Sequence, residues 1–190
     1  MKRALKWLAG IVVVVVVLIG AIAVWGMFLP KQHAIARTVE LAQPPEAVWA
    51  VVSDYGAQPS WRKDAASVER LPDRAGKDLW RITTTHGSWA YLRTAESAPP
   101  QRLVVETLTE QDGPAFITWR FEIAPAGSGT RVTIHETGDF GNPYTRFMVR
   151  YVLGQTKFVD DYLTYLAQKF GEQPLINDTQ SRIATAGELR

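Results

Sequence analysis

Three polar residues occupy positions that are otherwise apolar, and these are the side chains with which the chain could do chemistry. Glu136 falls on the same strand face as Ile134 if the segment alternates, and Thr84 falls on the same face as Ile82. Gln155 lies in the middle of an apolar helical stripe, where leucine would pack better. We predict that all three contact the polar part of a ligand. Two alternatives stay open: Glu136 lies in solvent at a strand end, and Gln155 is a core amide bonded within the protein.

Glu136 is also the candidate for acid–base catalysis. A carboxyl group surrounded by Trp and Tyr is desolvated, which raises its pKa toward the range of a useful general acid or base. One carboxylate without a visible partner in the sequence does not identify an enzyme. Catalysis is therefore the alternative to simple ligand binding.

Sequence signals for metals and common cofactors are absent. His33, His86 and His135 are far apart along the chain and have no acidic residues at ligand spacing, and the chain contains 0 Cys. It has no G-x-S-x-G motif, no P-loop and no dinucleotide-binding glycine pattern. We expect no metal site and no cofactor.

Large aromatic side chains with polar tips are frequent after residue 40. Buried Trp and Tyr need a partner for their N–H or O–H, and small-molecule pockets are usually lined by aromatic walls with a few polar groups. We predict a largely apolar cavity, while some of these aromatic residues simply fill core. The predicted ligand-binding residues are Trp61, Trp80, Thr84, Trp89, Tyr91, Trp119, Phe121, Glu136, Tyr151, Gln155, Phe158 and Tyr162.

Seven segments between turn signals have the composition and alternation of strands. The clearest alternation is in residues 117–123, where apolar residues at odd positions alternate with polar ones. The connections are short, which predicts a mostly antiparallel meander. The predicted strands are 35–42, 67–71, 78–85, 88–96, 102–109, 116–124 and 130–137.

Two helices are predicted, a short one that starts at Pro45 and a long amphipathic one over residues 143–170. Asn142 is a plausible N-cap, Pro143 suits the first helical position, and Gly171 is a stop signal, while Gly154 weakens or bends the helix. One side is apolar and needs a large surface to pack against. Arg146, Arg150 and Lys157 form a basic edge on the opposite side, either solvated or in contact with lipid headgroups.

The N-terminal segment from Trp7 to Leu29 contains no charged residue. As a helix it would measure about 34 Å, enough for a hydrocarbon layer of about 30 Å. Its valine run would favour a strand in water, but in lipid the backbone must bond within its own segment. We predict a single transmembrane helix, in contact with the membrane through residues 7–29, and Trp7 and Trp25 resemble interfacial anchors.

Flanking charge predicts a cytoplasmic N-terminus and an extracytoplasmic domain. Lys2, Arg3 and Lys6 precede the apolar run, against Lys31 and Arg37 after it. A cleaved signal peptide is the alternative, because residues 21–23 (Ala-Ile-Ala) resemble a cleavage site. The apolar run continues past that site, which favours an uncleaved anchor. Either version exports the domain if the N-terminus is cytoplasmic.

Without the N-terminal flank the chain is nearly neutral, which argues only against a strongly basic surface. Of 21 Lys and Arg residues, three belong to the N-terminal flank, which leaves 18 against 19 Asp and Glu. We therefore expect no nucleic-acid partner. The predicted organisation is an anchor (1–30), a linker (31–36), one domain (37–171) and a polar flexible tail (172–190).

The order of elements and several short motifs resemble the START-like (SRPBCC) superfamily, in its polyketide cyclase/dehydrase and lipid-transport branch. The motifs are Pro44-Pro45-Glu46-Ala47-Val48-Trp49 with Val52-Ser53-Asp54, Pro59-Ser60-Trp61, Ala98-Pro99-Pro100-Gln101-Arg102-Leu103, Trp119-Arg120-Phe121 and Gly129-Thr130-Arg131-Val132-Thr133. The resemblance covers about residues 35–170. It implies an α+β helix-grip fold, in which a curved seven-stranded antiparallel sheet wraps around the C-terminal helix and an apolar ligand lies between them.

These observations predict a membrane-anchored domain that binds or transports a hydrophobic small molecule or lipid. An enzyme of the cyclase/dehydratase type that uses Glu136 in the same cavity is one alternative. A non-catalytic protein-interaction module without a cavity is the other. Because fold does not fix activity, the residues of the site must decide between them.

Overall fold

The computed structural model describes residues 2–178, which form two compact units. One unit contains the residues up to Gln32 together with Phe140–Gln155. The other contains His33–Asp139 together with the residues from Thr156 onward. The second unit holds nearly all of the predicted site, and the first holds the apolar N-terminal helix.

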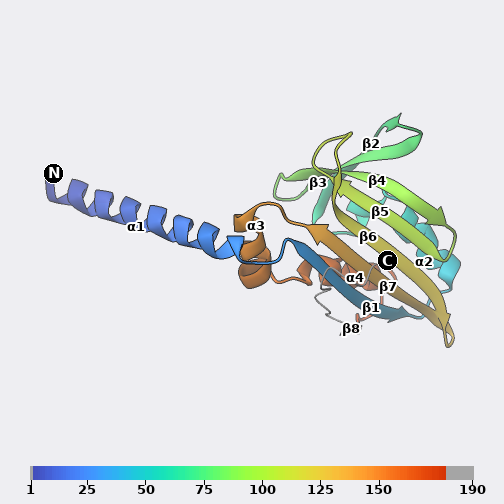
Figure 1. Cartoon of the computed structure of the whole chain (residues 1–190). Helices are drawn as coiled ribbons and strands as arrows, with labels where there is room; N and C mark the ends of the chain where they lie inside the picture. The colour runs from blue at the N-terminus through green and yellow to red at the C-terminus, as the bar shows by residue number, and fades with distance from the viewer. Residues whose placement is uncertain (1, 179–190) are drawn as a thin grey trace. The chain divides into compact units, whose positions relative to one another are not determined.

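The larger unit is built on an eight-stranded sheet in the order β2-β3-β4-β5-β6-β7-β1-β8 (Figure 1). Consecutive strands from β2 to β7 pair antiparallel, as the short connections predict, and β1 pairs antiparallel with β8. The predicted α+β class and antiparallel meander are confirmed. The strands are β1 (Gln32–Leu41), β2 (Ala65–Arg74), β3 (Lys77–Thr84), β4 (Trp89–Ala98), β5 (Arg102–Leu108), β6 (Ala115–Ala126), β7 (Gly129–Asp139) and β8 (Ile176–Asp178).

The sheet has one strand more than the seven predicted. Strand β8 lies within the predicted tail and pairs Ile176 with Val39 and Asp178 with Arg37. Three residues are too few to show a period of two, so the pattern missed this strand. Strand β1 also begins at Gln32, so most of the predicted linker 31–36 is strand. Residues 179–190 of the predicted tail lie outside the described residues.

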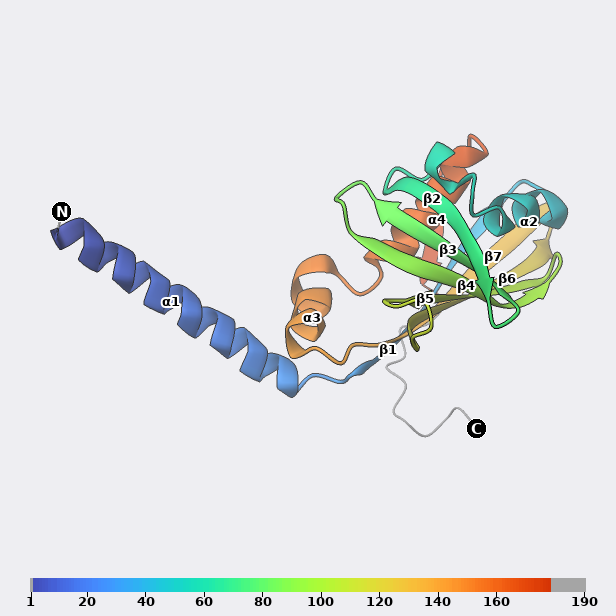
Figure 2. The same cartoon turned by 90° about the horizontal axis from the view of Figure 1, so that it is seen from above.

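Helices α2 (Pro45–Ser53) and α4 (Lys157–Lys169) cover one face of the sheet, which we call the inner face (Figure 2). Because strand side chains alternate, every second residue of each strand points to this face. The strand, α2 and α4 residues that meet there form one apolar core. Its fully buried members include Val39, Val48, Val52, Val132, Ile134, Val159, Leu163 and Leu166.

The predicted single helix over residues 143–170 is wrong, because the chain is interrupted in the middle of it. Helix α3 (Pro143–Met148) continues into a π-helical turn, η2 (Val149–Leu153), and α4 begins only at Lys157. Gly154 lies between them with φ 85° and ψ 137°, a conformation that L-residues rarely adopt. The sequence indicated a weak point at this glycine but not a complete break.

Both ends of the interrupted segment match their predicted signals. The side chain of Asn142 accepts a hydrogen bond from the backbone N–H of Tyr144 at 2.8 Å, and Pro143 is the first helical residue. After α4, Gly171 has φ 74° and ends the helix. The capping residues were therefore predicted correctly, although they belong to two different helices.

The smaller unit contains α1 (Lys2–Met27), α3 and η2. Among the described residues, α1 is the one helix that is long and apolar enough to cross a membrane, a property that signal sequences share. The predicted basic edge is not formed. Arg146 is buried at 7% exposure, and Lys157 pairs with Asp161 at 2.6 Å, which leaves Arg150 exposed.

Candidate ligand-binding site

Tyr162 of α4 lies at the centre of an aromatic cluster on the inner face. Its ring centroid is 5.4 Å from that of Trp61, 5.2 Å from that of Trp119 and 5.5 Å from that of Phe121, each in an edge-to-face arrangement. Trp119 and Phe121 are alternate residues of β6, so both point inward, and Trp61 follows the short 3-10 turn η1 (Gln58–Ser60). We call these four residues the aromatic cluster. All four were predicted as ligand-binding residues.

Two polar atoms of the aromatic cluster and one of strand β3 are buried and have no hydrogen-bond partner among the described residues. They are the hydroxyl oxygen of Tyr162, the indole nitrogen of Trp61 and the hydroxyl oxygen of Thr84. Thr84, at the end of β3, pairs with Ala65 of β2. Ala65 is buried and follows Trp61 by four residues in the chain. A buried polar group without a partner costs about 1–3 kcal/mol, so three of them among apolar surfaces require a reason. Burial also raises the pKa of Tyr162, which keeps its hydroxyl neutral.

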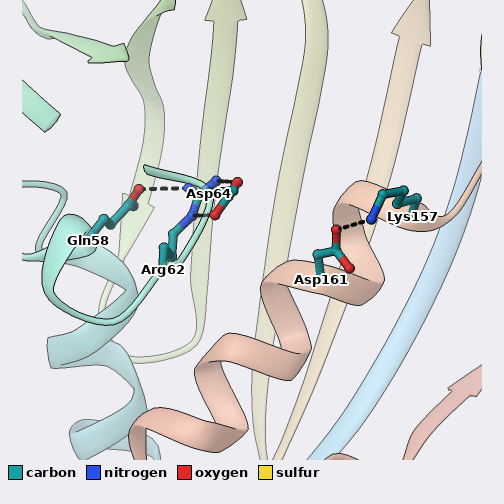
Figure 3. A network of polar contacts seen from close by, with 5 residues as sticks. All are labelled: Gln58, Arg62, Asp64, Lys157 and Asp161. Carbon is teal, nitrogen blue, oxygen red and sulfur yellow. Dashed lines mark hydrogen bonds and ion pairs between the residues drawn. The ribbon is translucent and has the colours of Figure 1, made fainter. Parts of the chain in front are cut away.

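A guanidinium group covers the ring of Tyr162. Arg62 lies 5.1 Å from the ring centroid, a cation–π distance. Its orientation is fixed by Asp64, at 2.7 Å, and by the side-chain oxygen of Gln58, at 2.8 Å (Figure 3). Because Asp64 balances its charge, Arg62 acts here mainly as a planar cover over the aromatic ring.

Trp80 is held by a separate polar network on the inner face. Its indole N–H donates to Asp78 at 2.9 Å, and the hydroxyl of Thr94 donates to the same carboxylate oxygen. The hydroxyls of Thr94 and Tyr55 are 2.9 Å apart, and burial raises the pKa of Tyr55 to about 12. Trp80 therefore has its polar atom satisfied within the protein and offers only its ring as an apolar wall.

Glu136 points inward, and it has a partner that the sequence did not reveal. It is 3% exposed and accepts a hydrogen bond from the indole N–H of Trp119 at 2.5 Å, while Nε2 of His33 lies 3.1 Å from its other oxygen. The alternative of a solvated Glu136 is wrong. His33 was missed because it was assigned to a linker, although the alternation of Ile35 and Val39 extends back to it.

A second ion pair joins α4 to the sheet. Arg37 of β1 contacts both carboxylate oxygens of Asp160, through Nε at 2.7 Å and Nη2 at 3.2 Å. Two parallel N–H···O bonds fix direction as well as distance. This pair therefore sets how α4 lies against β1. The sequence does not reveal this pair, because the two residues are 123 positions apart.

The chain matches the family model described as polyketide cyclase / dehydrase and lipid transport over residues 32–170. It belongs to this family. The match begins with β1 and ends one residue after α4, so it includes strands β1 to β7, α2 and α4. The recognition of a START-like domain from its motifs is confirmed. No curated protein matches the chain.

Solved structures of low sequence identity share the fold. A START superfamily protein from Mycobacterium smegmatis is 22% identical, with 72% of this chain and 96% of that chain covered and a TM-score of 0.56. The ZhuI aromatase/cyclase from Streptomyces sp. R1128 is 15% identical, with 72% and 93% covered and a TM-score of 0.54. A protein from Rhodobacter sphaeroides is 20% identical, with 73% and 92% covered and a TM-score of 0.51.

Five of the predicted site residues lie elsewhere in this polyketide cyclase/dehydrase and lipid-transport family member. Trp89 is 54% exposed, and its ring centroid lies 5.3 Å from that of Tyr91. Both residues occupy odd positions of β4, whose side chains point to the outer face, opposite the inner face. Phe158 is 48% exposed at the start of α4. Tyr151, 54% exposed, and Gln155, half-buried, belong to the unit that contains α1. Strand alternation places Trp89 and Tyr91 on the outer face, and the break after Leu153 places Tyr151 and Gln155 in the smaller unit.

Within residues 2–178, no group of three His, Asp or Glu side chains is placed to hold a metal ion. The predicted residues that do face inward are the aromatic cluster with Trp80, Thr84 and Glu136. They combine large apolar surfaces with a few polar atoms. Such a set suits recognition of an apolar molecule that carries one or two polar groups.

Proposed function

We propose that this protein is a membrane-anchored member of the family that binds a hydrophobic small molecule or lipid between α4 and the inner face of its sheet. The observation that carries the proposal is that the buried polar atoms of Tyr162, Trp61 and Thr84 have no hydrogen-bond partner within residues 2–178. A ligand with a hydroxyl, carbonyl or ester group would give each of them a hydrogen bond. Family membership and the apolar helix α1 support the same proposal.

The binding would be physical rather than covalent. Moving apolar area of the ligand from water to the aromatic cluster contributes about 25 cal/mol per Å². The polar atoms then select among apolar molecules, because a ligand that leaves them unpaired binds less tightly. Anchoring by α1 would hold the domain at high effective concentration near ligands dissolved in the membrane.

Native mass spectrometry of the full-length protein, extracted in detergent, tests this proposal. We expect a copurified lipid or uptake of an added apolar probe, and weaker retention in Tyr162→Phe. Trp89→Phe on the outer face is the matched control and should leave retention unchanged. Protein recovered without any adduct from lipid-rich cells, and without uptake of apolar probes, would contradict the proposal.

The contact between Glu136 and His33 favours an enzyme of the cyclase/dehydratase type as the second candidate. A buried carboxylate bonded to an imidazole is an arrangement that can remove and return a proton. Under this alternative, Glu136→Gln would lose turnover by at least about 100-fold while ligand affinity persists. Under the binding proposal, the same variant changes retention of a ligand and there is no turnover to lose.

We further propose that the N-terminus is cytoplasmic and that the domain is extracytoplasmic. The support is the excess of basic residues before the apolar run, Lys2, Arg3 and Lys6, over those after it. Because the chain has 0 Cys, Ser97→Cys provides a single exposed thiol in the domain. Labelling of intact cells by a membrane-impermeant maleimide would support this orientation, and the intact mass would show whether the N-terminal segment is retained.

A further inference from the structure

An apolar surface is exposed beside the end of helix α1. It belongs to residues Pro143–Leu153, which comprise α3 and η2 and which we call the collar segment. Four of its large side chains are largely exposed: Tyr144 at 47%, Tyr151 at 54%, Val152 at 59% and Leu153 at 41%. So much exposed apolar area on two consecutive helical elements marks an interaction surface.

Arg146 fixes the collar segment to the C-terminal end of α1. Its guanidinium donates to the backbone oxygens of Gly26 and Leu29, at 3.2 Å each, and to those of Phe140 and Gly141, at 2.7 Å each. The carbonyls at a helix C-terminus lack intrahelical partners, so a buried cation there both caps the helix and complements its dipole. The collar segment therefore stays at the level where the apolar run ends.

Close packing and a side-chain contact reinforce this attachment. A Cβ atom added to Gly26 would lie 2.0 Å from the backbone oxygen of Pro143, so α3 approaches α1 as closely as only glycine allows. A hydrogen bond from Trp25 lowers the pKa of Tyr151. All of these contacts lie within one compact unit. Their arrangement does not depend on the placement of the larger domain.

The charged residues within the collar segment have one sign. Residues 143–156 contain Arg146 and Arg150 but no Asp or Glu. Arg150 is exposed on the collar segment and Lys31 is exposed just after α1. Trp25 and Phe28, 60% and 84% exposed, add aromatic side chains of the kind that concentrate at the membrane–water boundary. The surface therefore complements an apolar layer bounded by negative charge.

We propose that the collar segment lies in the lipid–water interface of the membrane and docks onto anionic headgroups. The inference rests on the proposed function, because it takes α1 as the membrane-spanning helix. Tyr151, Val152 and Leu153 enter the boundary between headgroups and acyl chains, and Arg150 contacts lipid phosphates. The collar segment then gives the domain a second, shallow contact with the bilayer, beyond the tether.

Fluorescence quenching by brominated lipids tests this proposal on the full-length protein. Val152→Cys, Val14→Cys and Ser97→Cys each introduce a single thiol for a small fluorophore, since the chain has 0 Cys. All three positions are exposed, so the substitutions do not disturb packing. The labelled proteins are reconstituted in phosphatidylcholine bilayers with and without phosphatidylglycerol. Lipids brominated near the carbonyl group should quench the label at residue 152 several-fold more than the label at residue 97.

The label at residue 14 separates the two proposals. If it is quenched by deeply brominated lipids and the label at residue 152 is not quenched at all, α1 spans the membrane and the docking of the collar segment is wrong. If the label at residue 14 is also unquenched, the anchor itself is wrong. Phosphatidylglycerol should increase quenching at residue 152, and Arg150→Gln should remove that increase. Quenching that is insensitive to phosphatidylglycerol, or a label shielded by a second copy of the chain, would contradict docking onto anionic lipid.

Discussion

The hydroxyl of Tyr162 is the atom at which stability and ligand binding should oppose one another. It is buried without a partner among the described residues, so Tyr162→Phe removes a desolvated polar group and keeps the ring contacts. We expect the free energy of unfolding in denaturant to stay constant or rise by about 1 kcal/mol. Retention of a copurified lipid should fall in the same variant.

Tyr55→Phe is the matched control for that substitution. The hydroxyl of Tyr55 is also buried, but it is 2.9 Å from the hydroxyl of Thr94 and so has a partner. We expect this variant to lower the free energy of unfolding by about 1 kcal/mol. If Tyr162→Phe destabilises the protein as much as Tyr55→Phe does, the hydroxyl of Tyr162 is bonded within the protein and is not a ligand contact.

The stability of the protein should depend on the oxygens of Glu136 as hydrogen-bond acceptors much more than on its charge. Glu136→Ala leaves the indole N–H of Trp119 buried without an acceptor and also opens space in the core. We expect a loss of about 3 kcal/mol in the free energy of unfolding. Glu136→Gln retains an acceptor for Trp119 and should lose less than half as much in the same denaturant titration. Equal losses would mean that charge, not hydrogen bonding, holds Glu136 in place.

The residue-level predictions from sequence succeeded where only local geometry was needed. A period of two was enough to place Glu136 and Thr84 on the inner face. The same period also excludes Tyr91 from that face, which selection by residue type overlooked. His33 and Arg37 could not be found in this way, because their partners are 103 and 123 positions distant and only the closed sheet brings them together.

At the level of elements, Gly154 determines that residues 143–170 form two helices. With φ 85° and ψ 137° it occupies a backbone region that strains any residue with a Cβ. We expect Gly154→Ala to lower the free energy of unfolding by about 1–3 kcal/mol. Gly141→Ala is the control, since Gly141 has no positive φ and a Cβ there meets no atom within 4 Å. An increase in helical circular dichroism without loss of stability would instead mean that the break is not fixed.

The ion pair between Arg37 and Asp160 should be worth more than a surface pair, because it joins α4 to β1 with two bonds. The side chains are 17% and 27% exposed, against 55% and 57% for the single-oxygen pair of Arg131 with Glu40. Double-mutant cycles in denaturant should give a coupling energy of about 1–2 kcal/mol for the first pair. For the second pair we expect below about 0.5 kcal/mol. Similar values for both pairs would remove the role of Arg37 in positioning α4.

Whether an element could be predicted depended on its length and on what its pattern reports. Strands β2 to β7 are long enough to alternate and are separated by glycine and proline turns, so their order and pairing followed directly. Residues 143–170 carry an apolar stripe throughout, but a stripe reports only that one side avoids water. It does not distinguish a side that packs on a sheet, as in α4, from one that stays exposed, as in η2.

At the scale of the whole molecule, the polarity of each unit follows from where its apolar surface goes. The main apolar core of the larger unit lies on one inner face, where residues of α2 and α4 pack against it. The smaller unit leaves its apolar residues on the outside, along α1 and on the collar segment. The first arrangement shields an apolar core from water, and the second is suited to lipid. The family resemblance was enough to predict the first arrangement from the sequence. The exposure of the collar segment could be seen only in the structure.

Alkaline pH should destabilise the larger unit through its buried tyrosines. Burial raises the pKa of Tyr55 from 10.0 to about 12 and also raises that of Tyr162. Below pH 10 the folded and unfolded states both keep these hydroxyls protonated, so their titration does not lower the free energy of unfolding. Between pH 10 and 12 the unfolded state loses the protons first, and Tyr55 alone should cost about 2–3 kcal/mol by pH 12.

The comparison of Tyr55→Phe with the unsubstituted chain isolates this effect from the titration of lysines. Denaturant unfolding between pH 8 and about pH 11.5 should give a shallower decline for Tyr55→Phe, beyond the constant offset from the lost contact with Thr94. Tyr144→Phe, which replaces a tyrosine that is 47% exposed, should follow the unsubstituted chain throughout. Parallel curves for all three proteins would show that the hydroxyl of Tyr55 reaches water in the folded state, and the inner face would then be open to solvent rather than reserved for an apolar ligand.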